Sequence, residues 1–503
     1  MNAPTDFEAF SRRYLKGEAQ VVATTLVADL ETPVSAFLKL AGDLPNAFLL
    51  ESVEGGQARG RYSMIGLKPD LIFRADGDRA EINRTPQTDR DAFVPCAEPP
   101  LTALRALLAE SAIDLPEGAP PMAAGVFGYL GYDMVRQMEK LSAPKPNIIG
   151  VPDALLIRPT LMVVFDAVKD ELTAVTPVRP KPGVSPQAAW EAALLRLDAV
   201  VEALERSVAH PAPEPFHDQI AATSNTTPDQ YRAMVEKAKE YIRAGDIFQV
   251  VLSQRFESPF ALPPFALYRA LRRVNPAPFL VYLNFDGFSV VCSSPEILVR
   301  LREGKVTIRP IAGTRRRGAT PTEDEALAQE LLADPKERSE HLMLLDLGRN
   351  DVGRVSKIGS VSVTDSFFIE RYSQVMHIVS NVEGDIAPAC DALDALAAGF
   401  PAGTVSGAPK VRAMEIIDEL EKDKRGIYAG AIGYFGANGE MDTCIVLRTA
   451  VVKDGRMYVQ AGAGIVYDSV PESEQQECVN KAKALFRAGE EAVRFAARAR
   501  NGQ

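Results

Sequence analysis

Hydrophobic and polar residues alternate along the chain with two periods, one typical of strands and one typical of helices. In the first third, short apolar runs bounded by turn residues predict strands at 47–52, 71–74 and 160–165. Apolar positions three or four residues apart predict helices at 100–108 and 187–206. The first third therefore mixes both kinds of element.

The helix signals are clearest after residue 226. Thr227 is a typical N-cap, Pro228 occupies the first helical position, and an apolar stripe follows until Gly245 and Asp246 end the helix. The stripe consists of Tyr231, Met234, Val235, Ala238, Tyr241 and Ile242. A long acidic helix is expected at 322–347.

Strand patterns fill most of the remaining chain. They lie at 247–253, 279–285, 289–292, 305–310, 374–383 and 430–435. A helix at 410–421 and a final helix at about 471–498 complete the pattern. The sum predicts a mixed α/β protein with large, mostly antiparallel sheets.

The chain has 503 residues, more than one ordinary core accommodates, so we expect more than one part. Segment 209–227 is rich in Pro, Ala and polar residues and predicts a linker or surface loop. It separates an N-terminal part, 1–208, from a C-terminal part, 228–503. Within the first part, the glycine and aromatic segment 125–132 indicates close backbone packing against another element.

Composition restricts the class of protein. Hydrophobic residues make up 46% of the chain and charged residues 24%, as in soluble globular proteins. The formal net charge of -11 argues against a nucleic-acid binder. No apolar run reaches the ~18 residues that predict a membrane span, and residues 1–12 do not resemble a signal peptide. Five dispersed cysteines without metal-ligand spacing are typical of reduced thiols, so we expect a cytoplasmic protein.

Two pairs of glutamates share the same spacing on predicted helices. Glu337 and Glu340 are three residues apart, as are Glu474 and Glu477, and Lys481 follows on the same face as Glu477. Carboxylates from two helices are suitable ligands for Mg²⁺. For either pair alone, a solvated helix surface with paired charges is the commoner explanation.

Two glycine-rich segments and two isolated polar residues could form a binding site. Segment 400–410 opens a helix and could bind an anion, and 460–464 allows a ligand to approach the backbone; a tight turn explains each equally well. His377 lies in an apolar strand, where it is either a core residue or an acid near neutral pH. Arg448 lies among apolar residues and needs an anion as partner. Together with the glutamates, these residues indicate a Mg²⁺ site for a carboxylated metabolite.

Several longer motifs, in a fixed order through 229–486, resemble the chorismate-binding enzymes and among them the anthranilate synthase large subunits. They are GDIFQVVLS (245–253), SSPEI (293–297), PIAGTRRRG (310–318), EHLMLLDLGRNDV (340–352), HIVSNVEG (377–384), FPAGTVSGAPK (400–410), YAGAIGY (428–434) and QAGAGIV (460–466). The resemblance implies an α+β fold in which large, mostly antiparallel sheets pack as a sandwich with flanking helices. It also implies conversion of chorismate and ammonia into anthranilate and pyruvate.

The resemblance assigns roles to individual positions. It implies a Mg²⁺ site formed by Glu337, Glu340, Glu474 and Glu477. The substrate-binding positions that it implies are Gly313, Thr314, Tyr428, Arg448, Gly462, Ala463, Gly464 and Lys481. Thr404 lines the same pocket and is implied to be a catalytic position. His377 and Glu296 are similar to the family's proton-transfer pair.

Two positions distinguish members of the family. Gln249 stands where the water-adding isochorismate and salicylate enzymes have a lysine, and Ala312 stands where aminodeoxychorismate synthases have a nucleophilic lysine. Gln249 cannot activate water as a base, and Ala312 has no nucleophile for covalent attack on the ring, so direct attack by ammonia is favoured. The alternatives are an aminodeoxychorismate synthase large subunit and, in another class, a non-catalytic amino-acid sensor.

A feedback site for tryptophan is the last feature that the resemblance implies. Its positions are Leu50, Glu51, Ser52, Arg61, Pro278, Phe279, Leu280, Ile432, Gly433, Tyr434 and Cys444. Phe279 and Leu280 replace the Tyr and Met of the family pattern. Since no glutaminase nucleophile elbow is found, we expect a glutamine amidotransferase partner, in a hetero-oligomer of two large and two small subunits.

Overall fold

The computed structural model describes residues 6–54, 58–208, 220–372 and 375–500. Its helices are α1 (Phe7–Leu15), α2 (Pro33–Leu40), α3 (Pro100–Glu110), α4 (Pro186–Glu205), α5 (Pro228–Ala244), α6 (Pro264–Val274), α7 (Pro321–Ala333), α8 (Pro335–Gly353), α9 (Ala392–Gly399), α10 (Lys410–Leu420) and α11 (Pro471–Arg500), with short 3-10 helices η1 (Tyr132–Gln137) and η2 (Gly403–Val405).

The strands of the first part are β1 (Gln20–Val27), β2 (Ala47–Glu54), β3 (Ala58–Asp76), β4 (Arg79–Asn83), β5 (Phe93–Pro95), β6 (Gly125–Leu130), β7 (Ala154–Asp166) and β8 (Glu171–Val178). Those that follow are β9 (Thr223–Ser224), β10 (Gln249–Pro259), β11 (Phe279–Phe285), β12 (Phe288–Ser294), β13 (Ile297–Arg302), β14 (Lys305–Ile308), β15 (Ile311–Arg316), β16 (Ser362–Arg371), β17 (Val375–Asp385), β18 (Gly407–Ala408), β19 (Ala431–Gly436), β20 (Met441–Ile445), β21 (Thr449–Lys453) and β22 (Arg456–Ile465).

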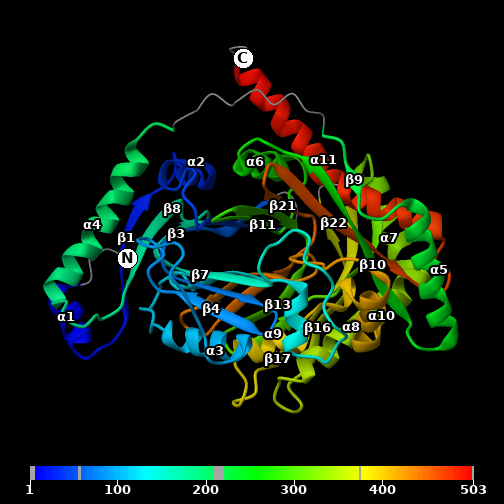
Figure 1. The fold of residues 1–503 in the computed structure, drawn as a ribbon, viewed down its shortest axis with the longest axis horizontal. Coiled ribbons are helices and arrows are strands. Elements are labelled where there is room, and N and C mark those ends of the chain that lie inside the picture. Colours follow the sequence, from blue (N-terminus) through cyan, green and yellow to red (C-terminus); the bar gives the residue numbers. More distant parts are fainter. Residues whose placement is uncertain (1–5, 55–57, 209–219, 373–374, 501–503) are drawn as a thin grey trace.

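The strands form one connected antiparallel network that folds into two layers (Figure 1). One layer has the order β1-β8-β7-β3-β2-β11-β12-β21-β22-β10. The other has the order β5-β4-β3-β7-β6-β19-β20-β13-β14-β17. The long strands β3 and β7 belong to both, and a register shift between Pro69 and Leu71 separates their two halves. The predicted sandwich is confirmed.

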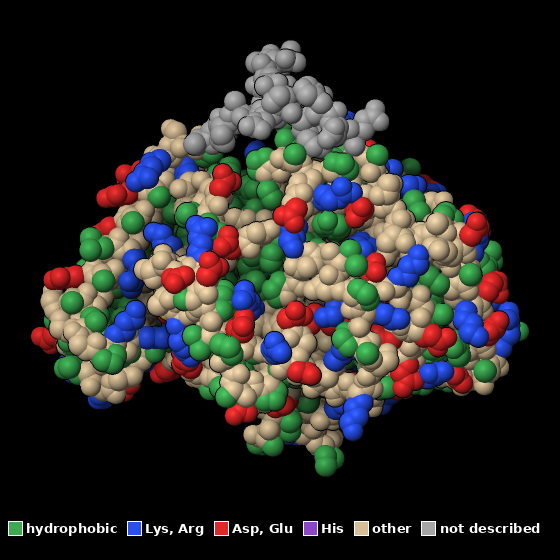
Figure 2. All heavy atoms as spheres, viewed as in Figure 1, with side chains coloured by type: hydrophobic (Ala, Val, Ile, Leu, Met, Phe, Trp, Pro, Cys, Tyr) green, Lys and Arg blue, Asp and Glu red, His purple; other side chains and the backbone are tan. Residues whose placement is uncertain are grey.

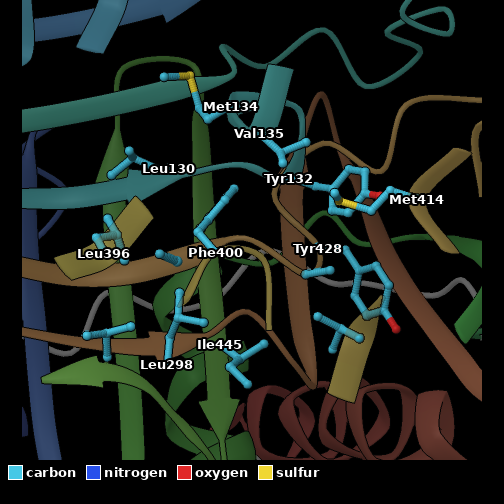
Figure 3. Close-up of a cluster of buried hydrophobic side chains, with 14 of the residues drawn as sticks. Leu130, Tyr132, Met134, Val135, Leu298, Leu396, Phe400, Met414, Tyr428 and Ile445 are labelled. Carbon is cyan, nitrogen blue, oxygen red and sulfur yellow. The ribbon is translucent and has the colours of Figure 1, made fainter. Parts of the chain in front are cut away.

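Successive side chains of a strand point to opposite faces of its layer, so they belong to different clusters of the hydrophobic core. On β2, Phe48 and Leu50 face a cluster between the layers, whereas Leu49 faces a second cluster beneath α2, α4, α6 and α11. The other layer is covered mainly by α3, α8 and α9, whose cluster is shown in part in Figure 3. Both faces of each layer are therefore buried, which explains the nearly continuous apolar strands in the sequence.

Most predicted elements are present, and one is wrong. The helix expected at 322–347 is two helices, because Pro335 begins α8 and Asp334 caps it by accepting from the N–H groups of Lys336 and Glu337. α5 has the predicted ends, with a Thr227 capping box and left-handed Gly245. The break places Glu337 in the first turn of its own helix.

Each layer contains strands from both the N-terminal and the C-terminal part of the chain. β2 pairs with β11 in one layer, and β6 pairs with β19 in the other. Gly128 lies opposite Gly433, where added Cβ atoms would lie 2.1 and 2.0 Å from backbone oxygens of Leu155 and Asp442, so the predicted close packing of 125–132 is confirmed. Residues 209–219 of the predicted linker lie outside the described residues. The rest of the predicted linker includes β9, which pairs with β10. The division into parts stays a prediction.

Two surface findings complete the fold. Basic and acidic side chains are interspersed over the face shown in Figure 2. Within the described residues, no helix has the length and apolar character required to cross a membrane.

Candidate functional site

Two connections between the layers lie side by side and carry the predicted acid and the predicted cation. Glu296 lies between β12 and β13, and Arg448 lies between β20 and β21. The Ile445 N–H donates to the Glu296 carbonyl at 3.0 Å, and the Ser293 N–H donates to the Arg448 carbonyl at 3.2 Å. Arg448 has a φ of +46°, a strained value for a non-glycine residue. Both residues thus project from irregular backbone where strands change layers.

Glu296 is a buried carboxyl group, 7% exposed. Burial raises its pKa to about 8, although a hydrogen bond from Thr404 and the positive charges of Arg448 and Lys481 act in the opposite direction. Thr404 Oγ1 donates to Glu296 Oε1 at 3.2 Å. Glu296 is therefore largely protonated at neutral pH and can donate a proton.

Arg448 is a half-buried cation whose guanidinium has no hydrogen bond or ion pair to any residue that the structure describes. Burial lowers its pKa, and the neighbouring Tyr428, Glu296 and Glu477 raise it. Since a half-buried charge favours a counter-charge, this site suits an anionic ligand.

Tyr428 and the glycines of β22 form one wall beside Arg448. The Tyr428 hydroxyl is 2.9 Å from where a Cβ on Gly462 would lie, and Gln249 Nε2 is 2.6 Å from such an atom on Gly464. Figure 3 shows Tyr428 at the margin of the core cluster, with its hydroxyl pointing away from it. Lys481 donates to the Gly462 carbonyl at 2.9 Å. The glycines are therefore required for close contact with these side chains, and the approach of a ligand to their backbone stays a prediction.

His377 on β17 lies against β15. Its Nδ1 is 2.9 Å from the Gly313 carbonyl and 3.1 Å from Thr314 Oγ1. Burial lowers the pKa of His377 to about 4 against the effect of the Gly313 hydrogen bond. The imidazole is neutral at neutral pH, so Nδ1 donates to the carbonyl and Nε2 retains a lone pair. His377 can therefore accept a proton at Nε2, and its place in the proton-transfer pair stays a prediction.

The four predicted metal ligands lie on α8 and α11, and Glu477 of α11 is near enough to Glu340 of α8 to affect its pKa. Burial and the charges of Glu337 and Glu477 raise the pKa of Glu340. Burial and Glu477 likewise raise the pKa of Glu474, despite a hydrogen bond from Ser469. This mutual repulsion shows that the carboxylates share one region.

Cations balance part of this charge. Arg315 donates to Glu337 at 3.1 Å, and Lys481 pairs with Glu477 at 2.7 Å. In the described part of the chain, no three His, Cys, Asp or Glu side chains are arranged so that they could hold a metal ion. The donor chemistry fits a hard cation, but the carboxylates do not converge on one point.

A model of the chorismate binding enzyme family matches residues 45–487, which include all the site residues described above. The chain belongs to the chorismate-binding enzymes. It is 60% identical to anthranilate synthase component 1 from Cereibacter sphaeroides, over 99% of this chain and 100% of that one. It is 48% identical to the Pseudomonas putida protein of the same name, over 93% of this chain and 94% of that one.

Solved structures agree with the fold of this chorismate-binding enzyme. Anthranilate synthase component I from Streptococcus pneumoniae aligns with a TM-score of 0.74 at 38% identity, over 85% of this chain and 92% of that one. The menaquinone-specific isochorismate synthase from Escherichia coli aligns with a TM-score of 0.70 at 20% identity, over 96% and 99%. The second likeness shows the fold alone.

The predicted tryptophan residues of this chorismate-binding enzyme lie on or beside strands of both layers. Leu50, Ile432, Tyr434 and Cys444 are buried between the layers, and Phe279 packs against them. Ile432 pairs with Cys444, Gly433 with Thr443, and Phe279 with Ser52. These positions share one region of the sandwich.

The remaining tryptophan positions are separated from that region. Glu51 and its cross-strand partner Leu280 face the helices, where Arg272 donates to Glu51 at 2.7 and 2.9 Å. Arg61 pairs with Asp166 at 2.9 Å. Pro278 lies immediately before β11. Glu51 and Arg61 are thus already paired within the protein.

Arg425 was missed by sequence reasoning. It is buried behind Tyr428 and lies in the unremarkable string KDKRGIY. Glu421 and Ser253, which form a hydrogen-bonded group with it, were missed as well. Glu421 and Arg425 are four residues apart, but only the fold brings Ser253 to them.

Proposed function

We propose that the chain is the large subunit of an anthranilate synthase, a lyase of tryptophan biosynthesis that converts chorismate and ammonia into anthranilate and pyruvate. The observation that carries the proposal is that Glu296, an acid with a raised pKa, and Arg448, a cation without a partner among the described residues, lie on neighbouring connections of one site. Chorismate offers what such a site needs, namely a carboxylate for the cation and a hydroxyl that leaves when protonated. The full-length similarity to anthranilate synthase component 1 supports the same choice.

In the first half-reaction, ammonia forms the new N–C bond at ring C2 while the C4–O bond breaks. Glu296 donates its proton to the departing hydroxyl, which leaves as water, and the added nitrogen loses a proton. Thr404 holds the Glu296 carboxyl in place. Arg448 and Tyr428 orient the enolpyruvyl carboxylate beside the glycine wall.

In the second half-reaction, the proton at C2 leaves, the C3–O bond breaks, and the departing enolpyruvate takes a proton to become pyruvate. His377 is neutral and has a free lone pair at Nε2, which suits it to accept the C2 proton. Aromatisation of the ring drives this step.

Mg²⁺ is proposed at Glu337, Glu340, Glu474 and Glu477. When bound, the ion would neutralise the ring carboxylate of chorismate. The mutual repulsion of these carboxylates supports a cation between the helices. Movement of Arg315 and Lys481 from their present partners would free Glu337 and Glu477 for the ion.

Two side chains favour ammonia over other nucleophiles. Gln249 is 4% exposed and Ala312 is 8% exposed, and neither can act as a base or a covalent nucleophile. To separate this proposal from an aminodeoxychorismate synthase, the protein is mixed with chorismate, Mg²⁺ and ammonium and the fluorescence of anthranilate is followed. A non-fluorescent 4-amino product would identify the rival, and absence of any turnover would favour the amino-acid sensor.

A glutamine amidotransferase partner and tryptophan inhibition complete the proposal. The chain alone should use ammonium but not glutamine, and adding the glutaminase subunit should restore glutamine-dependent activity. Light scattering of the mixture should then give two copies of each subunit. Tryptophan is expected to lower the affinity for chorismate through the region around Leu50, Phe279 and Tyr434, and inhibition unchanged in Tyr434→Ala would contradict that location.

A further inference from the structure

Arg425, between α10 and β19, has a side chain that is 1% exposed and makes four hydrogen bonds. Two join it to the Glu421 carboxylate, with Nε at 2.9 Å and Nη2 at 2.6 Å. The other two join it to backbone carbonyls, with Nη1 at 2.7 Å from Val405 and Nη2 at 2.6 Å from Val251. The planar guanidinium therefore connects three separate segments of the chain.

Each of these backbone contacts lies next to a residue of the proposed chorismate site. Val405 follows Thr404, which donates to Glu296. Val251 lies opposite Gly464 in the pairing of β10 with β22. A displacement of Arg425 would therefore move Thr404, which holds the Glu296 carboxyl, and also the glycine wall.

The faces of the same guanidinium lie against two aromatic rings. Its Cζ is 5.6 Å from the ring centre of Tyr428 and 4.8 Å from that of Tyr132. Tyr428 belongs to the site, and Tyr132 belongs to η1 in the N-terminal part, close to Tyr428 in Figure 3. Such contacts restrict the rotation of a tyrosine ring.

Glu421 extends the network to β10. Its Oε1 accepts from the Ser253 N–H and from Ser253 Oγ, both at 2.8 Å. Ser253 lies opposite Gly462, and its hydroxyl also accepts from Gln460 Nε2 at 2.8 Å. β22, which carries the glycine wall, and its partner β10 are therefore both fixed to the Arg425–Glu421 pair.

We propose that Arg425 is a positioning residue of the chorismate site, which fixes Thr404, Tyr428 and the Gly462–Gly464 wall relative to one another without touching substrate. The proposal rests on the proposed function. Its physical basis is that a misplacement of about 1 Å costs on the order of 100-fold in rate. A lysine keeps the charge but cannot serve all four acceptors in these directions.

The test is Arg425→Lys, with Arg158→Lys as a matched control. Arg158 is also buried, makes four hydrogen bonds to Asp70, Glu110 and Ser111, and lies away from the site. The kcat and KM for chorismate are measured with ammonium as nitrogen donor, and thermal unfolding is recorded for both variants. Arg425→Lys is expected to lower kcat at least tenfold, about the effect of a small misplacement, and to raise KM several-fold, whereas Arg158→Lys leaves both within about twofold.

The change in KM separates positioning from mere loss of stability, because partial unfolding lowers the active fraction without changing the affinity of the folded enzyme. A folded Arg425→Lys with kcat and KM within twofold of the unaltered protein would overturn the inference, as would equal kinetic changes in Arg158→Lys. If Arg425→Lys does not fold, Glu421→Gln keeps the shape of the network and should shift kcat and KM in the same directions; unchanged constants there overturn it. Failure of the unaltered protein to form anthranilate would instead contradict the proposed function.

Discussion

At the scale of single residues, Glu296 is the group whose protonation the proposed reaction requires. Glu296→Gln removes the proton but keeps the shape, and we expect kcat to fall by about 100-fold or more. In the unaltered protein, burial raises the pKa of Glu296 to about 8, so the active protonated form is lost as the pH rises through that value.

The measurement for Glu296 is the pH profile of kcat, with the rate referred to free ammonia rather than to total ammonium. The unaltered protein should lose activity above about pH 8, and the residual activity of Glu296→Gln should lack that limb. The same alkaline limb in both proteins would assign it to another group.

Arg448 makes the second prediction at this scale. Because the guanidinium has no partner among the described residues, Arg448→Lys should fold, but it loses the planar fork that binds a carboxylate. We expect KM for chorismate to rise about 10- to 100-fold, which corresponds to a charged hydrogen bond of about 1.5–3 kcal/mol. Equilibrium binding of chorismate, measured by calorimetry, checks this without turnover, and unchanged affinity would contradict it.

The sequence indicated these two residues for different reasons. Arg448 was visible as an arginine among apolar residues, because such a charge needs a partner. Glu296 was visible only through the resemblance, since SSPEI shows nothing unusual by itself. The direction of the His377 pKa was not predictable, because it depends on burial against β15 and on the Gly313 carbonyl.

At the scale of elements, α8 and α11 form the proposed metal site. Glu340→Gln removes one of several repelling carboxylates, so the thermal midpoint without Mg²⁺ should stay the same or rise. The midpoint of the unaltered protein should rise on addition of Mg²⁺ and that of Glu340→Gln should not, because binding to the folded state alone stabilises it.

Asp346→Asn is the matched control for this pair of helices. It removes one carboxylate from the exposed face of α8, where Asp346 pairs with Arg349 and is 77% exposed. Its response to Mg²⁺ should equal that of the unaltered protein. If Glu340→Gln also keeps the full response, Mg²⁺ is not held by this helix pair.

Elements were predicted well where local chemistry determines their ends. The cap at Thr227, the left-handed Gly245 and the limits of β11 all follow from nearby residues. Sheet order was not predictable, because β6 and β19 pair although they lie far apart in the sequence. The break at Asp334 was visible in principle, since Pro335 follows a capping residue.

At the scale of the whole molecule, the shared layers lead us to expect that the two parts of the chain do not fold independently. Residues 228–503 alone would expose the edges of β11 and β19 that β2 and β6 cover. We expect this fragment to aggregate when expressed alone and to become soluble when expressed together with residues 1–208. The soluble fraction and circular dichroism check this, and a soluble, folded 228–503 fragment would show that the predicted boundary separates true domains.

The same pairing has a consequence for synthesis of the protein on the ribosome. β6 is made about 300 residues before its partner β19. At about 5–20 residues per second, this strand waits roughly 15–60 s for the glycine-lined edge on which it will lie. During that interval Phe127 and Tyr129, both fully buried in the finished protein, are available to other nascent chains. We expect a chaperone that binds the emerging N-terminal part to raise the yield of folded protein, because it would cover these side chains during that interval.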